Sequence, residues 1–292
     1  MPKPVYRKFI QVDKHQLWCV KWQKNGQPLV LLHGGLSHTQ KWERQMLPAV
    51  YKTHEVFAYD RTAHGRTKVR KGYFHFDFQV TELINYLETV VKKPAHIIGW
   101  SDGGNIGLLA SLKRPDLVKS LIGIGMNYTW DAGLSFDLDN ISVSEEEKVN
   151  FAKLSKQDPE LLPQIIKKAY QVWQSEPNIK LSKLKKIKCP VLVLAGDDEP
   201  FTSQMTWQMY EAIPNGRLAV IPGASHNLVN EKTKLMQEII KDFYKSLDFP
   251  ITKMPNRRAR RQAKIVRKTK LIIMKDTMQL SLYLNTLVRR CK

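Results

Sequence analysis

Ile-Ile-Gly-Trp-Ser-Asp-Gly-Gly, residues 97–104, is the stretch of sequence that decides the fold. Its apolar start is typical of a strand, residues 99–103 form a G-x-S-x-G pattern, and an apolar helical run follows at 106–112. A serine held between a strand and a helix is exposed on a sharp turn, at the positive end of the helix. We therefore predict that Ser101 is a nucleophile. The alternative is a glycine-rich turn with an incidental serine, and the flanking strand and helix argue against it.

Short apolar runs repeat on either side of this turn. Most end in Gly, Pro or Asp and do not alternate with polar residues, which is typical of strands buried on both faces of a parallel sheet. The expected strands are 29–32, 56–59, 97–98, 121–124, 191–194 and 218–221, with helical patterns at 80–91, 106–112 and 235–243. This alternation predicts an α/β fold with a mostly parallel, doubly wound sheet. An antiparallel hairpin is expected before it, over 9–20.

The alternation breaks between about residues 130 and 188. Ser144 and Glu147 form a capping box, and Asp158-Pro159-Glu160 starts a second helical pattern. The segment is longer than ordinary loops and crossovers, so we expect a small helical lid over the strand ends. The alternative is a pair of ordinary crossover helices. The expected organisation is one domain over 1–249 and a basic C-terminal tail over 250–292.

Bulk composition narrows the class of protein. The 292-residue chain is 42% hydrophobic and 25% charged, enough for one large core with an insertion or a tail. No run approaches the roughly 18 apolar residues of a membrane helix, and no apolar segment follows the basic start, so a cytoplasmic location is expected. Cys19, Cys189 and Cys291 have neither metal-ligand nor CxxC spacing. Neither a metal nor a cofactor is expected, and the oligomeric state is open.

A nucleophilic serine needs a general base and an acid that orients this base. His226 follows the last expected strand, where such a base belongs, whereas the other histidines considered (His15, His38, His54 and His75) have no such placement. Three adjacent carboxylates, Asp197, Asp198 and Glu199, follow the strand that begins at Val191. This concentration of like charge indicates that at least one has a function. Spacing alone does not choose among the three.

The loop His33-Gly34-Gly35-Leu36 ends the first buried strand. Backbone N–H groups of Gly35 and Leu36, together with that of Asp102, are the candidates for an oxyanion hole. His33 is expected to brace this loop. The segment 60–66 (DRTAHGR) ends the next strand and is expected to be scaffold rather than catalytic apparatus.

From about Pro28 to Leu247 the chain resembles α/β-hydrolases of the branch that contains valacyclovir hydrolase-like (biphenyl hydrolase-like) serine hydrolases and their bacterial relatives. The shared landmarks are LVLLHGG (29–35), DRTAHGR (60–66), GWSDGG (99–104), VLVLAGDDEP (191–200) and PGASHNL (222–228). The resemblance implies the α/β-hydrolase fold with a helical lid. It also implies that the acid is the residue before Pro200, which is Glu199 where relatives usually carry Asp, with Asp198 in reserve.

The resemblance further implies that Asp102 and Trp100 bind substrate, with Asp102 recognising the α-amino group of an aminoacyl ester. The alternative for Asp102 is that its charge stabilises the start of the following helix. The favoured function is hydrolysis of a small ester, or of an aminoacyl ester, lactone or amide, through an acyl-enzyme on Ser101. The alternative function is a non-catalytic or very slow binding protein of the same fold.

The charge of the chain is uneven. Of the net +20, residues 250–292 carry thirteen Lys or Arg against one Asp, or +12, which leaves +8 for the rest. Basic clusters such as 257–261 can bind nucleic acid or anionic membrane. The alternative is a solvated extension without a task. The expected partners are therefore a small ester or amide substrate and, through the tail, weak contact with nucleic acid or anionic membrane.

Overall fold

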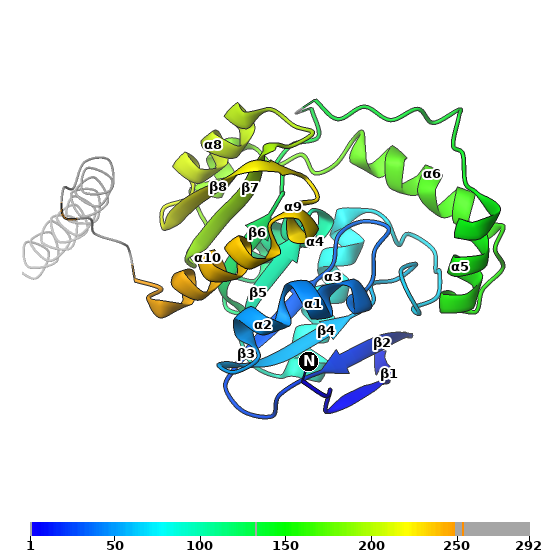
Figure 1. The fold of residues 1–292 in the computed structure, drawn as a ribbon, viewed down its shortest axis with the longest axis horizontal. Coiled ribbons are helices and arrows are strands. Elements are labelled where there is room, and N and C mark those ends of the chain that lie inside the picture. Colours follow the sequence, from blue (N-terminus) through cyan, green and yellow to red (C-terminus); the bar gives the residue numbers. More distant parts are fainter. Residues whose placement is uncertain (1, 132, 249–252, 254–292) are drawn as a thin grey trace, which may run out of the picture. The chain divides into compact units, whose positions relative to one another are not determined.

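The computed structural model describes residues 2–131, 133–248 and 253 (Figure 1). One compact unit covers Met1–Leu247. Apart from Lys253, the expected basic tail lies outside the described residues. No helix in the described part of the chain is both long enough and apolar enough to cross a bilayer.

An eight-stranded sheet forms the centre of this unit, in the strand order β1-β2-β4-β3-β5-β6-β7-β8. Strands β1 and β2 form the expected hairpin, β2 pairs antiparallel with β4, and strands β3 to β8 pair in parallel. The six predicted buried strands are confirmed, each somewhat longer than its apolar run. The strands are β1 Tyr6–Val12, β2 His15–Lys21, β3 Gln27–Leu32, β4 His54–Tyr59, β5 Ala95–Trp100, β6 Val118–Ile124, β7 Val191–Asp198 and β8 Gly216–Ser225.

Strands β3 to β7 are largely buried on both faces, which explains why their sequences are continuously apolar, whereas the edge strand β8 is partly exposed. Alternate residues of one strand enter different clusters: Val30 and Leu32 of β3 pack in one, and Leu29 and Leu31 pack in the other. The first cluster lies against α3 (Phe76–Tyr86), α4 (Asp102–Lys113) and α8 (Ser203–Ala212). The second lies against α1 (Trp42–Gln45), α2 (Leu47–Val50), α9 (Leu228–Glu231) and α10 (Thr233–Lys245), which Figure 1 shows in front of the sheet.

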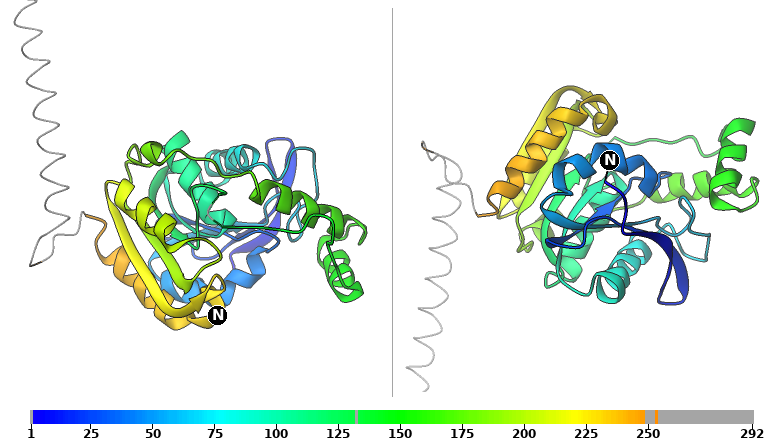
Figure 2. Two further views of the ribbon diagram at one scale, coloured as in Figure 1. Left: turned by 90° about the horizontal axis from the view of Figure 1, so that it is seen from above. Right: turned by 60° about the horizontal axis from the view of Figure 1, so that its bottom comes forward.

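Three helices fill the long connection between β6 and β7, where the insertion was expected. They are α5 (Glu145–Ser155), α6 (Leu161–Trp173) and α7 (Leu181–Leu184). The Ser144 hydroxyl accepts a bond from the Glu147 amide and the Glu147 carboxylate accepts one from the Ser144 amide, so the predicted capping box is present. Helices α5 and α6 form an arm beside the sheet in both views of Figure 2. The domain boundaries and the function of these helices as a lid stay predictions.

Candidate active site

Ser101 lies on the turn between β5 and α4. Its φ of 53° and ψ of −121° are left-handed and costly for a residue with a Cβ. The neighbouring backbone permits the turn only because two positions lack side chains. A Cβ on Gly99 would overlap the backbone of Gly103, and a Cβ on Gly103 would overlap the carbonyl of Leu32. The G-x-S-x-G pattern is therefore explained by close approach of backbone segments.

The structure brings Ser101, His226 and Glu199 together from three different strand ends. His226, after β8, has its Nε2 3.0 Å from the Ser101 Oγ, so that the hydroxyl can donate to it. The His226 Nδ1 lies 2.5 Å from Oε2 of Glu199, which follows β7. The Glu199 carboxylate is buried, at 4% exposure, and its other oxygen accepts the Gly196 amide at 3.0 Å. This order of contacts is the arrangement of a nucleophile, a base and an orienting acid.

The other two carboxylates of the same loop face elsewhere. Asp197 accepts the Ala224 amide at 3.1 Å, and backbone N–H groups of this turn lower the pKa of its carboxyl. Asp198 is exposed, and its backbone pairs with Ser225 in the β7–β8 ladder. Of the three carboxylates, the geometry therefore places Glu199 beside His226.

Trp100, predicted to bind substrate, also holds the His226 loop. Its indole N–H donates to the His226 carbonyl oxygen at 3.0 Å, and its ring packs edge-on against Trp42. The edge-on ring of Phe201 also packs against the His226 ring. The imidazole is thus fixed by backbone and ring contacts as well as by its two polar partners.

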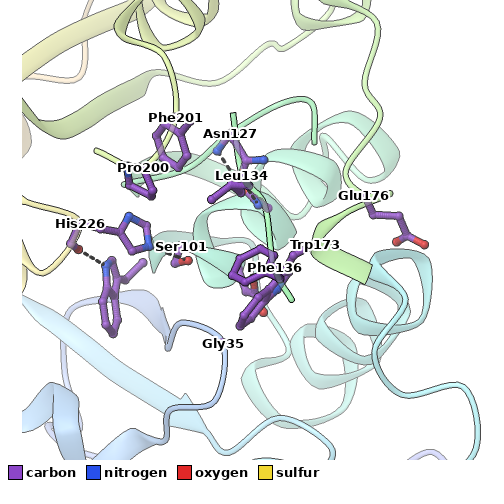
Figure 3. A pocket seen from close by; sticks show the side chains of 13 residues that line it. Gly35, Ser101, Asn127, Leu134, Phe136, Trp173, Glu176, Pro200, Phe201 and His226 are labelled. Atoms are coloured by element: carbon purple, nitrogen blue, oxygen red, sulfur yellow. Dashed lines mark hydrogen bonds between the residues drawn. The ribbon is translucent and has the colours of Figure 1, made fainter. Parts of the chain in front are cut away.

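A cavity of about 250 Å³ opens over Ser101. In Figure 3, Ser101 lies between His226 on one side and Phe136 and Trp173 on the other. Most of the walls are aromatic or aliphatic, and none of the described lining residues is Lys or Arg. They are Gly35, Trp100, Ser101, Asp102, Asn105, Asn127, Leu134, Phe136, Trp173, Glu176, Pro200, Phe201 and His226. A small, neutral, largely apolar group suits such a site.

The three oxyanion-hole candidates are distributed around this cavity. Gly35 and Asp102 line it, and Asp102 is the first residue of α4, so its amide is at the positive end of that helix. Leu36 has a left-handed φ of 49°, and it lines a second cavity instead. A Cβ on Gly35 would overlap the Trp173 ring, so the cap helix α6 rests directly on this loop.

Arg61 was assigned to scaffold, yet it reaches the candidate site. Its guanidinium is fully buried, donates to the Gly34 carbonyl at 2.8 Å and to Gln79, and lies 3.6 Å from Oδ2 of Asp102. Burial raises the pKa of the Asp102 carboxyl, and the Arg61 charge and a hydrogen bond from Trp173 oppose this shift. The Asp102 carboxylate is thus already paired within the protein. A basic residue two positions after an apolar strand was the signal in the sequence.

His33 braces its loop, as expected. Its Nε2 accepts the Arg61 amide at 3.1 Å, and its Nδ1 donates to the Gly34 carbonyl at 2.8 Å. Burial keeps the pKa of His33 well below its usual value, which matches a neutral ring with one donor and one acceptor. The Asp60 carboxylate adds a second brace, because it accepts the amides of Thr39 and Arg66 at 2.7 and 2.9 Å. These bonds show that His33 and Asp60 hold neighbouring loops in place; that the DRTAHGR loop has no catalytic role stays a prediction.

Among the described residues, no cluster of three or more His, Cys, Asp or Glu side chains is placed to hold a metal ion. Cys19 and Cys189 are both buried and unpaired in disulfides. Burial raises the pKa of the Cys189 thiol to about 12. It is therefore a protonated, unreactive thiol at neutral pH.

Comparison with known proteins shows which fold the chain shares. Residues 27–142 match the family model described as the alpha/beta hydrolase fold. The (E)-2-((N-methylformamido)methylene)succinate hydrolase of Acinetobacter baylyi is 25% identical over 70% of this chain and 85% of its own length. Human serine hydrolase BPHL is 22% identical over 65% of this chain and 70% of its own. The crystal structure of a serine hydrolase of carbazole degradation superposes with a TM-score of 0.67 at 19% identity, covering 83% of this chain and 99% of that one. Strand order and sequence matches agree that the chain has the α/β-hydrolase fold.

Proposed function

We propose that this protein is a serine hydrolase that cleaves small esters through an acyl-enzyme on Ser101. One observation carries the proposal: hydrogen bonds link Glu199 to His226 and His226 to Ser101, below an apolar cavity. Such a series of hydrogen bonds raises the nucleophilicity of an otherwise weak serine hydroxyl.

In the proposed reaction, Ser101, His226 and Glu199 each have a definite role. The Ser101 Oγ attacks the ester carbonyl while the His226 Nε2 takes its proton, and Glu199 stabilises the resulting imidazolium through the Nδ1–H. Backbone N–H groups of Asp102 and of the Gly35-Leu36 loop stabilise the oxyanion. His226 then returns the proton to the leaving alcohol. A water molecule, deprotonated by His226, attacks the acyl-enzyme, and the carboxylic acid and free Ser101 result.

The walls of the cavity favour a neutral acyl group. The Acinetobacter relative is named for a succinate derivative, whereas the described lining residues here include Asp102 and Glu176 but no cation. A dicarboxylate is therefore a poor match for this site. A cationic amine would also bind weakly, because both carboxylates already have partners: Asp102 is paired with Arg61, and Glu176 is held by His75 and the Phe76 amide. Small neutral esters are therefore the preferred substrate class, ahead of aminoacyl esters. Lactones and amides can be cleaved by the same acyl-enzyme chemistry.

Labelling with a fluorophosphonate and turnover of p-nitrophenyl acetate test the proposal. Ser101→Ala is expected to abolish labelling and to lower kcat by at least about 1,000-fold, since only the nucleophilic oxygen is removed. Ser246→Ala, which changes an exposed serine at the end of α10, serves as the matched control and keeps full activity. Labelling that persists in Ser101→Ala, or turnover close to that of the wild type, contradicts the proposal.

A further inference from the structure

A second cavity, of about 420 Å³, lies between the inserted helices and the loops that follow β3 and β4. It is lined by Leu36, Ser37, His38, Lys41, Ala63, His64, Gly65, Glu147, Asn150, Phe151, Leu154, Leu162, Ile165 and Ile166. Two features place it next to the active-site cavity. The adjacent residues Gly35 and Leu36 line the first and the second cavity respectively, and α6 borders both. Along α6, Ile166 and Trp173 are seven residues or about 10 Å apart.

Buried polar atoms in this cavity lack hydrogen-bond partners. They are the Ser37 Oγ, the His38 Nδ1 and the His64 Nε2, none of which is paired within the described chain. Ser37 and His64 are 5% and 3% exposed. The His64 Nδ1 donates to the Thr62 carbonyl at 2.9 Å, so the Nε2 of the neutral ring is an acceptor. An unpaired buried acceptor destabilises a protein, and a ligand that donates a hydrogen bond to the His64 Nε2 would remove this cost.

The walls define the rest of the ligand. Leu36, Phe151, Leu154, Leu162 and Ile165 are apolar and at least partly buried. The charged lining residues, Lys41 and Glu147, are both exposed and carry opposite signs. Burial lowers the pKa of His64 well below its usual value, so this side chain adds no charge. A neutral, apolar group with one hydroxyl or amide N–H matches this lining.

We propose that the second cavity binds the distal arm of the ester substrate, a neutral apolar chain or ring that donates a hydrogen bond to His64. The proposal rests on the proposed function, because the near arm lies over Ser101. Because Gly35 lines the first cavity and Leu36 the second, an ester that occupies both has its carbonyl beside the candidate oxyanion hole. The preferred substrates then have one small arm and one arm about 10 Å long, the separation of Ile166 and Trp173 along α6.

Matched esters test the length of the arm. In one series of acetates the alcohol grows from ethanol to octanol, and in one series of methyl esters the acid grows equally. We expect kcat/KM to rise about threefold to fourfold per methylene in one series. Ile166→Trp and Leu154→Trp fill the cavity from different helices and should bring the long ester down to the level of the short one, leaving the short ester unchanged. Val149→Trp, on an exposed site of α5 outside the cavity, is the control and keeps the gain.

A terminal hydroxyl tests the polar end. An ester whose arm ends in a hydroxyl should bind as tightly as its equally long methyl-ended counterpart, because His64 accepts the hydrogen bond. An apolar cavity without an acceptor rejects the hydroxyl by tenfold or more, on the order expected for an unpaired buried group. Ser37→Ala leaves His64 in place and is expected to keep this tolerance, whereas His64→Phe removes it.

Binding to the Ser101→Ala protein separates this inference from the proposed function. Calorimetry should show that the long ester binds more tightly than the short one, and that Ile166→Trp abolishes the difference. Equal binding of both esters, or a gain that survives both tryptophan variants, overturns the second cavity as a substrate site, whether or not Ser101 reacts with a fluorophosphonate. A protein that binds the long ester through this cavity while Ser101 stays unlabelled overturns the proposed function alone.

Discussion

Strained residues mark the loops around the candidate site. Three non-glycine residues with left-handed φ angles, Leu36, Ala63 and Ser101, follow β3, β4 and β5, which are adjacent in the sheet. At Ser101 the strain exposes a hydroxyl, and at Leu36 it shapes the loop over the cavity. Ala63, with a φ of 65°, occupies a position where the resembling hydrolases commonly carry Gly. Such strain persists only where the surroundings compensate for it. His33 and Asp60 supply compensating hydrogen bonds in the loops after β3 and β4.

The longer side chain of Glu199 raises the question of whether it can replace Asp as the acid. Its two oxygens have separate partners, the His226 ring and the Gly196 amide, so the extra methylene does not leave the carboxylate loose. We expect Glu199→Gln to lower kcat by about 10³- to 10⁴-fold, because an amide cannot stabilise the imidazolium. Steady-state turnover of p-nitrophenyl acetate measures this effect.

Asp198→Asn is the matched control for Glu199, since it neutralises the neighbouring, exposed carboxylate. It should keep kcat within about twofold, as exposed substitutions away from a site usually do. If Asp198→Asn loses activity while Glu199→Gln stays active, the acid is Asp198 and the assignment to Glu199 is wrong.

Asp102 illustrates how a residue's partners limit its possible roles. The sequence left recognition of a substrate amine and stabilisation of α4 as equal alternatives. The carboxylate is buried against Arg61 and accepts a bond from Trp173 on α6. This pairing favours a structural connection between the serine turn, the oxyanion loop and the cap helix. Its backbone N–H stays available as an oxyanion-hole candidate.

At the scale of elements, the pattern of apolar residues predicted those strands and helices whose sequences reflect how they are buried. Strands β3 to β7 were predicted from continuous apolar runs because both of their faces are covered, and β8 was predicted from the run 218–221 although it is partly exposed. Helix α8 was not predicted: its buried Met205, Met209 and Tyr210 are interspersed with polar residues, and no side chain caps its start. The second cavity was also not predictable, because loops after β3 and β4 meet α5 and α6 only in three dimensions. Ser101 and His226 could be chosen as candidates because each directly follows a strand.

A pair of buried histidines lies at the start of β4 and β5, the two strands on either side of β3. His54 and His96 have ring centroids 5.4 Å apart, both pack against Tyr244 of α10, and the His96 Nδ1 lies 2.8 Å from the Ser120 hydroxyl. Burial lowers the pKa of His96 to about 4, with His54 and Lys119 adding to the shift, and burial lowers that of His54 too. Both rings are therefore neutral in the folded state at neutral pH.

Acid should destabilise the protein through this pair. The lowered pKa of His96 means that the unfolded chain takes up its proton first, so stability is full above about pH 6.5 and falls as pH drops toward 4. Between pH 7.5 and 5, His96 alone should cost about 2 kcal/mol of unfolding free energy. His96→Gln cannot titrate, and urea unfolding at both pH values should show a correspondingly smaller loss. His15→Gln, on the β1–β2 hairpin, is the control; an equal loss in His96→Gln and wild type would refute the assignment.

At the scale of the whole chain, charge and chemistry are separated along the sequence. Every residue of the candidate site and of the second cavity lies within the unit Met1–Leu247. The net charge of +12 lies in residues 250–292, outside every motif of the site. A polycation of this kind binds phosphate backbones and anionic surfaces by releasing counterions, without any sequence specificity. Contact with nucleic acid or anionic membrane through this segment stays a prediction.

Ending the chain at Pro250 tests this separation. We expect the shortened protein to hydrolyse p-nitrophenyl acetate within about twofold of the full chain, as changes away from a site usually do. It should elute from heparin at lower salt, because twelve net positive charges are removed and fewer counterions are released on binding. Full-length protein with Arg257, Arg258, Arg260 and Arg261 changed to Ala is the matched control, and it should elute between the two. Unchanged retention on heparin would show that the +8 of the remaining chain carries the affinity, and insoluble shortened protein would show that the segment contributes to folding.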